Sequence, residues 1–197
     1  EDRVTVMAYV GDRADEVLFE LQDRLDLKVV PRGMVCFDVS HIQGTDTVGS
    51  AVTFENGVPK KAGYRHMKIR GGWGNDDFRS MAEVVTRYFR RALDEDAVLP
   101  DLVVIDGGKG QLNAAAKALV ALGLGHVAVI SLAKREEEVF LAGKSGPLIL
   151  SRRDQALHLL QRIRDEAHRF AISYNRKLRS RRTLESRLGE IPGVGPA

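Results

Sequence analysis

The sequence has little cysteine, few aromatic residues and no long apolar run. Its 197 residues include one cysteine, Cys36, so no disulfide forms within the chain and a small disulfide-stapled scaffold is excluded. Cys36 lies in the apolar run 34–37, which favours a place in the core over a reactive thiol. No apolar run approaches the ~18 residues that a membrane-spanning helix needs. We therefore expect no membrane segment.

Net charge is also small, because 30 basic residues against 27 acidic ones leave a formal charge of +3. The distribution is uneven: residues 1–30 hold eight acidic and four basic residues, whereas 151–182 hold ten basic and three acidic ones. Such a basic segment favours a polyanionic partner, since Lys and Arg bound to phosphates release counterions. An ordinary solvated helix face is the alternative. Candidate DNA contacts within the segment are Arg152, Arg153, Arg164 and Lys177.

Length and composition are those of one globular domain with a small appendage. Hydrophobic residues make up 44% of the chain and charged residues 29%, which is the balance of an ordinary folded protein. The chain begins with Glu1 and carries no signal peptide. We interpret it as a piece of a longer cytoplasmic protein and expect a monomer.

The hydrophobic pattern predicts an α/β fold. Helical spacing at 13–27 is followed by the apolar run 34–40, which is typical of a central strand buried on both faces. A hairpin at 50–69 is expected, because Asn56-Gly57 can adopt the positive φ angles of a type I′ turn. Further strands are predicted at 99–106 and 127–132, a small hairpin at 138–150, and helices at 78–93, 111–122 and 154–182. The order βββαβαβα predicts a ribonuclease H-like fold, a mixed five-stranded sheet with helices on both faces.

Two aspartates, Asp38 and Asp106, each end a predicted buried strand. If the two strands are neighbours, their carboxylates converge at one edge of the sheet. Carboxylates so close repel each other unless a cation lies between them, and a hard divalent ion such as Mg²⁺ or Mn²⁺ is the expected occupant. Such a site can activate water for hydrolysis. For either aspartate alone, a turn or a helix cap is the alternative interpretation.

A third candidate is His168, at the border of the apolar stripe of the 154–182 helix. There it could bind a metal ion or carry a proton, although a plain boundary residue is the alternative. Asp76 is a secondary catalytic candidate, since capping of the helix that follows explains it equally well. Lys109, in a glycine turn beside Asp106, is a candidate phosphate contact. No role is assigned to the other histidines, His41, His66, His126 and His158.

The chain ends on the turn sequence Pro-Gly-Val-Gly-Pro at 192–196. A turn of this kind presents successive backbone N–H groups to a DNA phosphate, as in a helix-hairpin-helix element. Gly193 and Gly195 are therefore candidate DNA contacts.

Five segments resemble the signature segments of the UvrC family. They are CFDVSH at 36–41, GNDD at 74–77, LPDLVVIDGGKGQL at 99–112, AKR at 133–135 and DEAHRFA at 165–171. The resemblance covers residues 34–197 in the family's order. It implies a ribonuclease H-like endonuclease domain at 31–185 and the start of a helix-hairpin-helix region at 186–197. Residues 1–30 match the family poorly beyond a leucine-rich helix, so we interpret them as a helical lead-in whose role stays open.

The resemblance also implies a reaction, the cut 5′ to a DNA lesion in UvrABC nucleotide excision repair. A separate N-terminal nuclease domain, which cuts on the 3′ side, and the segment that binds UvrB are not in this sequence. The family's Asp-Asp-His triad falls on Asp38, Asp106 and His168, with lesion-bearing double-stranded DNA as substrate. Two alternatives stay open: a non-catalytic nucleic-acid-binding module on the same fold, and an actin- or sugar-kinase-like phosphotransferase, whose fold also places aspartates at strand ends.

Overall fold

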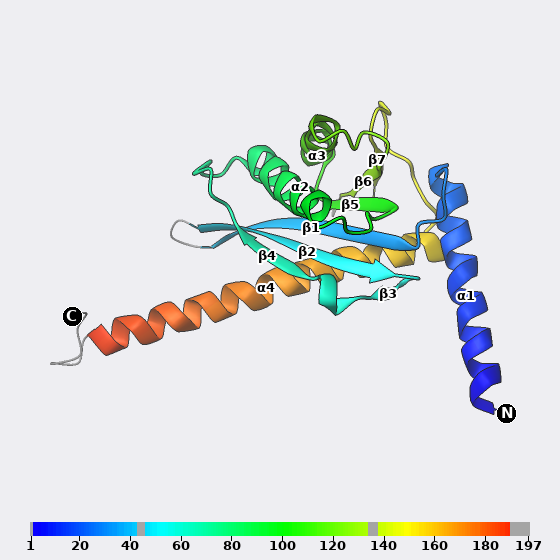
Figure 1. Cartoon of the computed structure of the whole chain (residues 1–197), viewed down its shortest axis with the longest axis horizontal. Helices are drawn as coiled ribbons and strands as arrows, with labels where there is room; N and C mark the ends of the chain where they lie inside the picture. Colours follow the sequence, from blue (N-terminus) through cyan, green and yellow to red (C-terminus); the bar gives the residue numbers. More distant parts are fainter. Residues whose placement is uncertain (1, 43–45, 134–137, 190–197) are drawn as a thin grey trace.

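A mixed β-sheet runs through the middle of the computed structural model, with two helices packed on each face (Figure 1). The structure describes the backbone of residues 2–42, 46–133 and 138–189, and the side chains of 13–41, 46–133, 138–177 and 180. Within these ranges, no helix has both the length and the apolar character to cross a bilayer. The division at 1–30, 31–185 and 186–197 stays a prediction.

The centre of the sheet is β1 (Gly33–Ile42), as its apolar sequence predicted. It pairs antiparallel with β2 (Asp46–Glu55) and parallel with β5 (Leu102–Asp106). Beyond β5, the next parallel strand is β6 (Ala128–Leu132). All five residues of β5 are buried, as expected of a parallel strand covered on both faces.

Short strands at the two edges bring the sheet to seven strands instead of the predicted five. The expected third strand is split into β3 (Val58–Pro59) and β4 (Arg65–Lys68), which both pair with β2 and flank the 3-10 turn η1 (Lys61–Gly63). The break follows Pro59, which has no N–H to continue a ladder. At the other edge, β7 (Val139–Leu141) pairs with β6.

Two of the predicted turns differ in outcome. The turn at Asn56-Gly57 is confirmed, with φ angles of 49° and 77° that suit a type I′ hairpin. The small hairpin expected at 138–150 is reduced to a single bridge between Val139 and Leu148.

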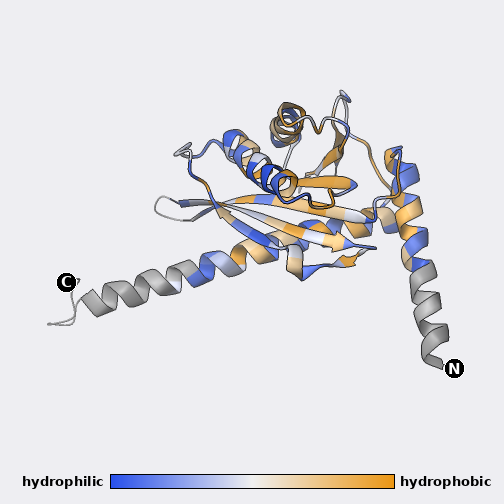
Figure 2. Cartoon of the chain, viewed as in Figure 1, coloured by the Kyte–Doolittle hydropathy of each residue, from blue (hydrophilic) through white to orange (hydrophobic). Residues whose placement is uncertain are grey.

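Successive residues along the strands point to opposite faces of the sheet and pack into two apolar cores. Met34 and Cys36 of β1 face α1 (Asp2–Leu25) and α4 (Gln155–Gly189), whereas Val35 and Phe37 face α2 (Asp77–Asp94) and α3 (Lys109–Ala121). In Figure 2 the central strand β5 is mostly apolar, whereas the edge strand β4 is hydrophilic. Burial of Cys36 confirms its predicted place in the core.

Helix α4 is the longest element and carries one of the candidate site residues. Its first half lies across the sheet with Leu160, Ile163, Ala167 and Ala171 buried, which confirms the predicted apolar stripe at these positions. Its second half continues past the edge of the sheet (Figure 1). Helix α1 packs against the beginning of α4 through Leu18, Leu21 and Leu25, so it shares the core of that face.

Candidate metal centre

The two candidate aspartates lie side by side because of the register of β1 and β5. These strands run parallel with Phe37 opposite Ile105, so Asp38 and Asp106 occupy the next position on each strand. Both carboxylates are buried, with 5% and 8% of the residue exposed. The predicted convergence of the two carboxylates is therefore present. The prediction that Asp38 ends its strand is wrong, because β1 continues to Ile42 through its pairing with β2.

Helix α4 brings His168 to the same point. Its Nδ1 lies 3.5 Å from Oδ2 of Asp38, and one ligand atom from each of Asp38, Asp106 and His168 lies within 4.8 Å of the other two. The His168 side chain is 48% exposed, whereas that of Asp38 is 7% exposed. The cluster is thus closed on the side of the sheet and open on the side of the helix, where a substrate can approach.

The buried thiol of Cys36 lies close to the two carboxylates of the cluster. Burial raises the pKa of the Cys36 thiol well above its ordinary value, and the nearby Asp106 and Asp38 carboxylates raise it further. Arg164 acts in the opposite direction on the same thiol. Cys36 therefore stays a neutral thiol and serves as packing beneath the acidic pair.

Arg164, which the sequence analysis predicted as a DNA contact, is buried instead. It is 9% exposed, and its guanidinium donates to Asp165 at 3.0 and 3.1 Å, so it is not part of an open basic face. The helical pattern placed it beside the apolar stripe, and the close approach of α4 to the sheet buries it. Its charge balances the interior of the site instead of contacting solvent.

The remaining predicted residues lie around the cluster or away from it. Asp76 caps α2 by accepting from Arg79 N at 3.0 Å, and it is not among the three clustered ligands. Lys109, in the first turn of α3, donates from Nζ to Ser145 O at 2.9 Å. Arg152, Arg153 and Lys177 are exposed. Gly193 and Gly195 lie outside the described residues.

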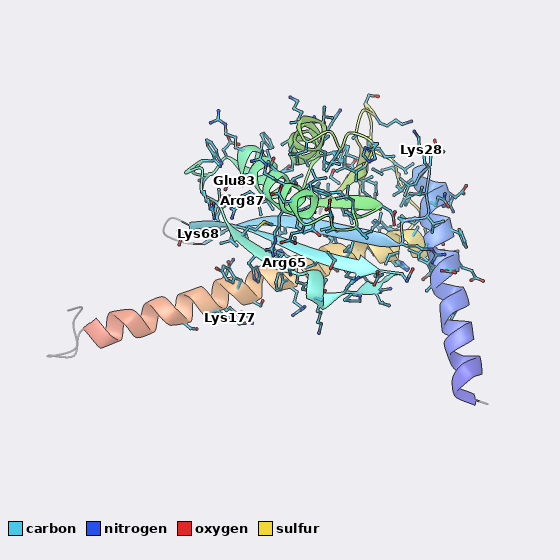
Figure 3. All side chains as sticks on the ribbon, viewed as in Figure 1. Lys28, Arg65, Lys68, Glu83, Arg87 and Lys177 are labelled. Atoms are coloured by element: carbon cyan, nitrogen blue, oxygen red, sulfur yellow. The ribbon has the colours of Figure 1, made fainter. Side chains whose placement is uncertain are left out.

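A basic edge was missed by the sequence analysis. Segment 60–70, which includes β4, holds five basic residues and no acidic one, and all five are exposed: Lys60, Lys61, Arg65, Lys68 and Arg70. Figure 3 shows Arg65 and Lys68 on this edge, with Arg87 of α2 close by and Lys177 on α4 beyond them. A count of charge in short windows would have found it, because the local excess is as one-sided as in 151–182.

The donor set suits a hard divalent ion. Two carboxylates and an imidazole are ligands that Mg²⁺ and Mn²⁺ accept, and a single cation between two buried carboxylates offsets their repulsion. Each ligand comes from a different element, β1, β5 and α4, all rigid parts of the fold. The structure therefore offers a preformed place for such an ion.

Comparison with known proteins decides the family. The family model described as "UvrC RNAse H endonuclease domain" matches residues 22–172. The chain belongs to this family. UvrABC system protein C of Gemmatimonas aurantiaca is 60% identical over 185 residues, and that of Gloeobacter violaceus is 56% identical over 190. Each match covers 94% of this chain but only 30% of the relative, so the chain spans less than a third of those UvrC proteins.

Solved structures of other proteins are similar at a distance. Human ENDOV aligns with a TM-score of 0.47 at 12% identity, over 86% of this chain and 98% of that one. Endonuclease V from Streptomyces avermitilis aligns with a TM-score of 0.45 at 18% identity, over 87% and 94%. Likeness this remote says nothing of reaction or substrate.

Proposed function

We propose that the chain is a metal-dependent DNA endonuclease domain that makes the cut 5′ to a lesion in nucleotide excision repair. The observation that supports this is the Asp38–Asp106–His168 cluster, with ligand atoms within 4.8 Å of one another, in a member of the UvrC RNase H endonuclease family. Membership of an endonuclease family counts against the phosphotransferase alternative. A non-catalytic module would have no use for two buried, adjacent carboxylates, whose repulsion costs stability.

Asp38, Asp106 and His168 would hold Mg²⁺ or Mn²⁺. A bound ion would lower the pKa of the water molecule that it holds, and its positive charge would stabilise the negative charge that develops on the phosphate. The strands β1 and β5 fix the two carboxylates so that they need not reorganise during the reaction. His168 is half-exposed beside Asp38 and serves either as the third ligand or, where the two carboxylates alone hold the ion, as the carrier of a proton between water and the leaving oxygen.

The proposed substrate is double-stranded DNA that carries a lesion. Its backbone would contact Arg152 and Arg153 in the turn before α4, Lys177 on α4, and the basic edge at 60–70. These side chains meet phosphates and carry no base readout, which suits an enzyme that must cut beside damage in any sequence. Lesion choice and contact with UvrB would come from parts of the parent protein outside this chain.

The test is incision of lesion-bearing DNA already nicked 3′ to the damage, by the full-length parent protein with its repair partners and Mg²⁺ or Mn²⁺. We expect Asp38→Asn to reduce the 5′ cut by roughly 1,000-fold, or about 4 kcal/mol of transition-state stabilisation. Asp94→Asn, an exposed change at the end of α2, is the matched control. If Asp38→Asn cuts as fast as wild type, the proposed function is wrong.

A further inference from the structure

The segment 64–66, which leads into β4, contacts α4 on both sides of His168. The first contact is polar: the Tyr64 hydroxyl donates to Oε1 of Glu166 at 2.8 Å. Arg169 donates to both oxygens of the same carboxylate at 2.6 and 2.7 Å, so Glu166 is held from two directions. Glu166 lies two residues before His168.

The second contact is a stack of rings. The imidazole of His66 lies flat between two rings of α4, with its centroid 3.6 Å from that of Phe170 and 4.2 Å from that of Tyr174. Its Nε2 is 3.1 Å from the carbonyl oxygen of Phe170, and Tyr64 packs edge-on to Phe170 at 5.0 Å. The stack thus begins two residues after His168.

Burial lowers the pKa of His66, against an opposing effect of the Phe170 carbonyl, and Lys177 lowers it further. The ring is therefore neutral near pH 7, which suits a place between two aromatic faces. The neutral His66 ring therefore acts as a flat packing surface, and its one hydrogen bond within the described part of the chain is the bond to the Phe170 carbonyl.

Residues 64–66 also lie in line with the acidic pair. Asp38 is opposite Ser50 on β2, and Ser50 is opposite His66 on β4, so these three residues form one row across the sheet. Helix α4 crosses above this row. Next to His168, the residues of α4 buried in the fold include the small Ala167 and Ala171, and Asn175 donates from Nδ2 to Ser40 Oγ of β1 at 3.3 Å.

We propose that Tyr64 and His66 are positioning residues, which fix the rotation of α4 so that the His168 imidazole faces Asp38 and completes the metal site. The inference rests on the proposed function, because it presumes that these residues bind an ion. Helix α4 continues past the sheet beyond the stack. The contacts at Glu166, Phe170 and Tyr174 therefore lie where the helix loses its support, and a small rotation there moves His168 away from Asp38.

The experiment measures Mn²⁺ binding to the full chain by calorimetry, together with the Mn²⁺-induced broadening of the His168 ring signals in NMR spectra. Tyr64→Phe removes one oxygen and keeps the ring, and His66→Ala removes the stack. We expect each to weaken Mn²⁺ binding by about 10-fold, at the low end of effects seen for outer-shell partners of metal ligands. His66→Phe keeps the stack and should restore most of the affinity.

Tyr88→Phe is the matched control, since Tyr88 lies on α2 against Phe37, on the opposite face of the sheet. It should leave Mn²⁺ affinity unchanged. If Tyr64→Phe and His66→Ala lower the thermal midpoint but bind Mn²⁺ like wild type and keep the His168 broadening, their role is structural and the inference is overturned. If wild type itself binds no Mn²⁺, the proposed function fails and the inference falls with it.

Discussion

Asp38→Asn is expected to stabilise the metal-free protein while it abolishes the response to metal. The change removes one of two like charges that the register of β1 and β5 buries side by side. Ligand atoms of the cluster lie within 4.8 Å of one another, and two unit charges at that distance repel by about 3.5 kcal/mol at an effective dielectric constant of about 20.

The net gain is smaller than this repulsion. Arg164 is buried nearby, so we expect about half of the repulsion to be relieved, or about 2 kcal/mol. For a chain of this length, each kcal/mol shifts the thermal midpoint by roughly 2–4 °C, which predicts a rise of about 4–8 °C.

The assay is scanning calorimetry in EDTA and then in Mn²⁺. Wild type should gain stability from Mn²⁺ by mass action, whereas Asp38→Asn should gain little. Asp94→Asn, an exposed change on α2, is the control and should stay within about 0.5 kcal/mol of wild type. A lower midpoint for Asp38→Asn in EDTA would refute the reasoning, because it would mean that the aspartate pair stabilises the metal-free fold.

Two further predictions concern the basic edge and the ring stack. Arg65→Gln with Lys68→Gln should weaken DNA binding and make the slope of log K against log[salt] less negative by about 2, since about 0.9 is lost per phosphate contact. Lys28→Gln, at the opposite end of the molecule in Figure 3, is the control, and equal salt slopes for all three proteins would contradict this assignment. Burial lowers the pKa of His66 below its ordinary value of 6.5. As the pH falls, this ring therefore gains a proton in the unfolded state before it does so in the folded state. The folded state loses stability below about pH 6.5, until the folded ring is protonated as well. The thermal midpoint of wild type relative to His66→Phe should therefore fall between about pH 7 and pH 5, and a constant difference would contradict the assignment.

Much of the fold could be predicted because its local signals agree. The central strand predicted at 34–40 lies within β1, and the helix predicted at 78–93 matches α2, which Asp76 caps as its position suggested. These elements have a clear apolar run or hydrophobic period, so local chemistry largely decides where they lie. The same reasoning placed Asp106 at the end of its strand, but Asp38 lies inside β1, because pairing with β2 carries that strand on to Ile42.

The rest depended on packing between distant parts of the chain. Periodicity put Arg164 at the border of a helix face, but only the depth of contact between α4 and the sheet determines that it is buried. His66 had no local signal, because its partners, Phe170 and Tyr174, are about a hundred residues away in sequence. His168 was supported by the family resemblance more than by its own pattern, for the same reason.

The three ligands of the cluster are far apart along the chain, at positions 38, 106 and 168. A bound ion would close two loops of more than sixty residues each, and such contacts form late in folding because they carry a large closure entropy. Neither the β1–β5 pair nor the docking of α4 assembles the site alone. A partly folded chain, newly made or damaged, therefore holds no complete site, and the proposed metal centre arises only in the finished fold.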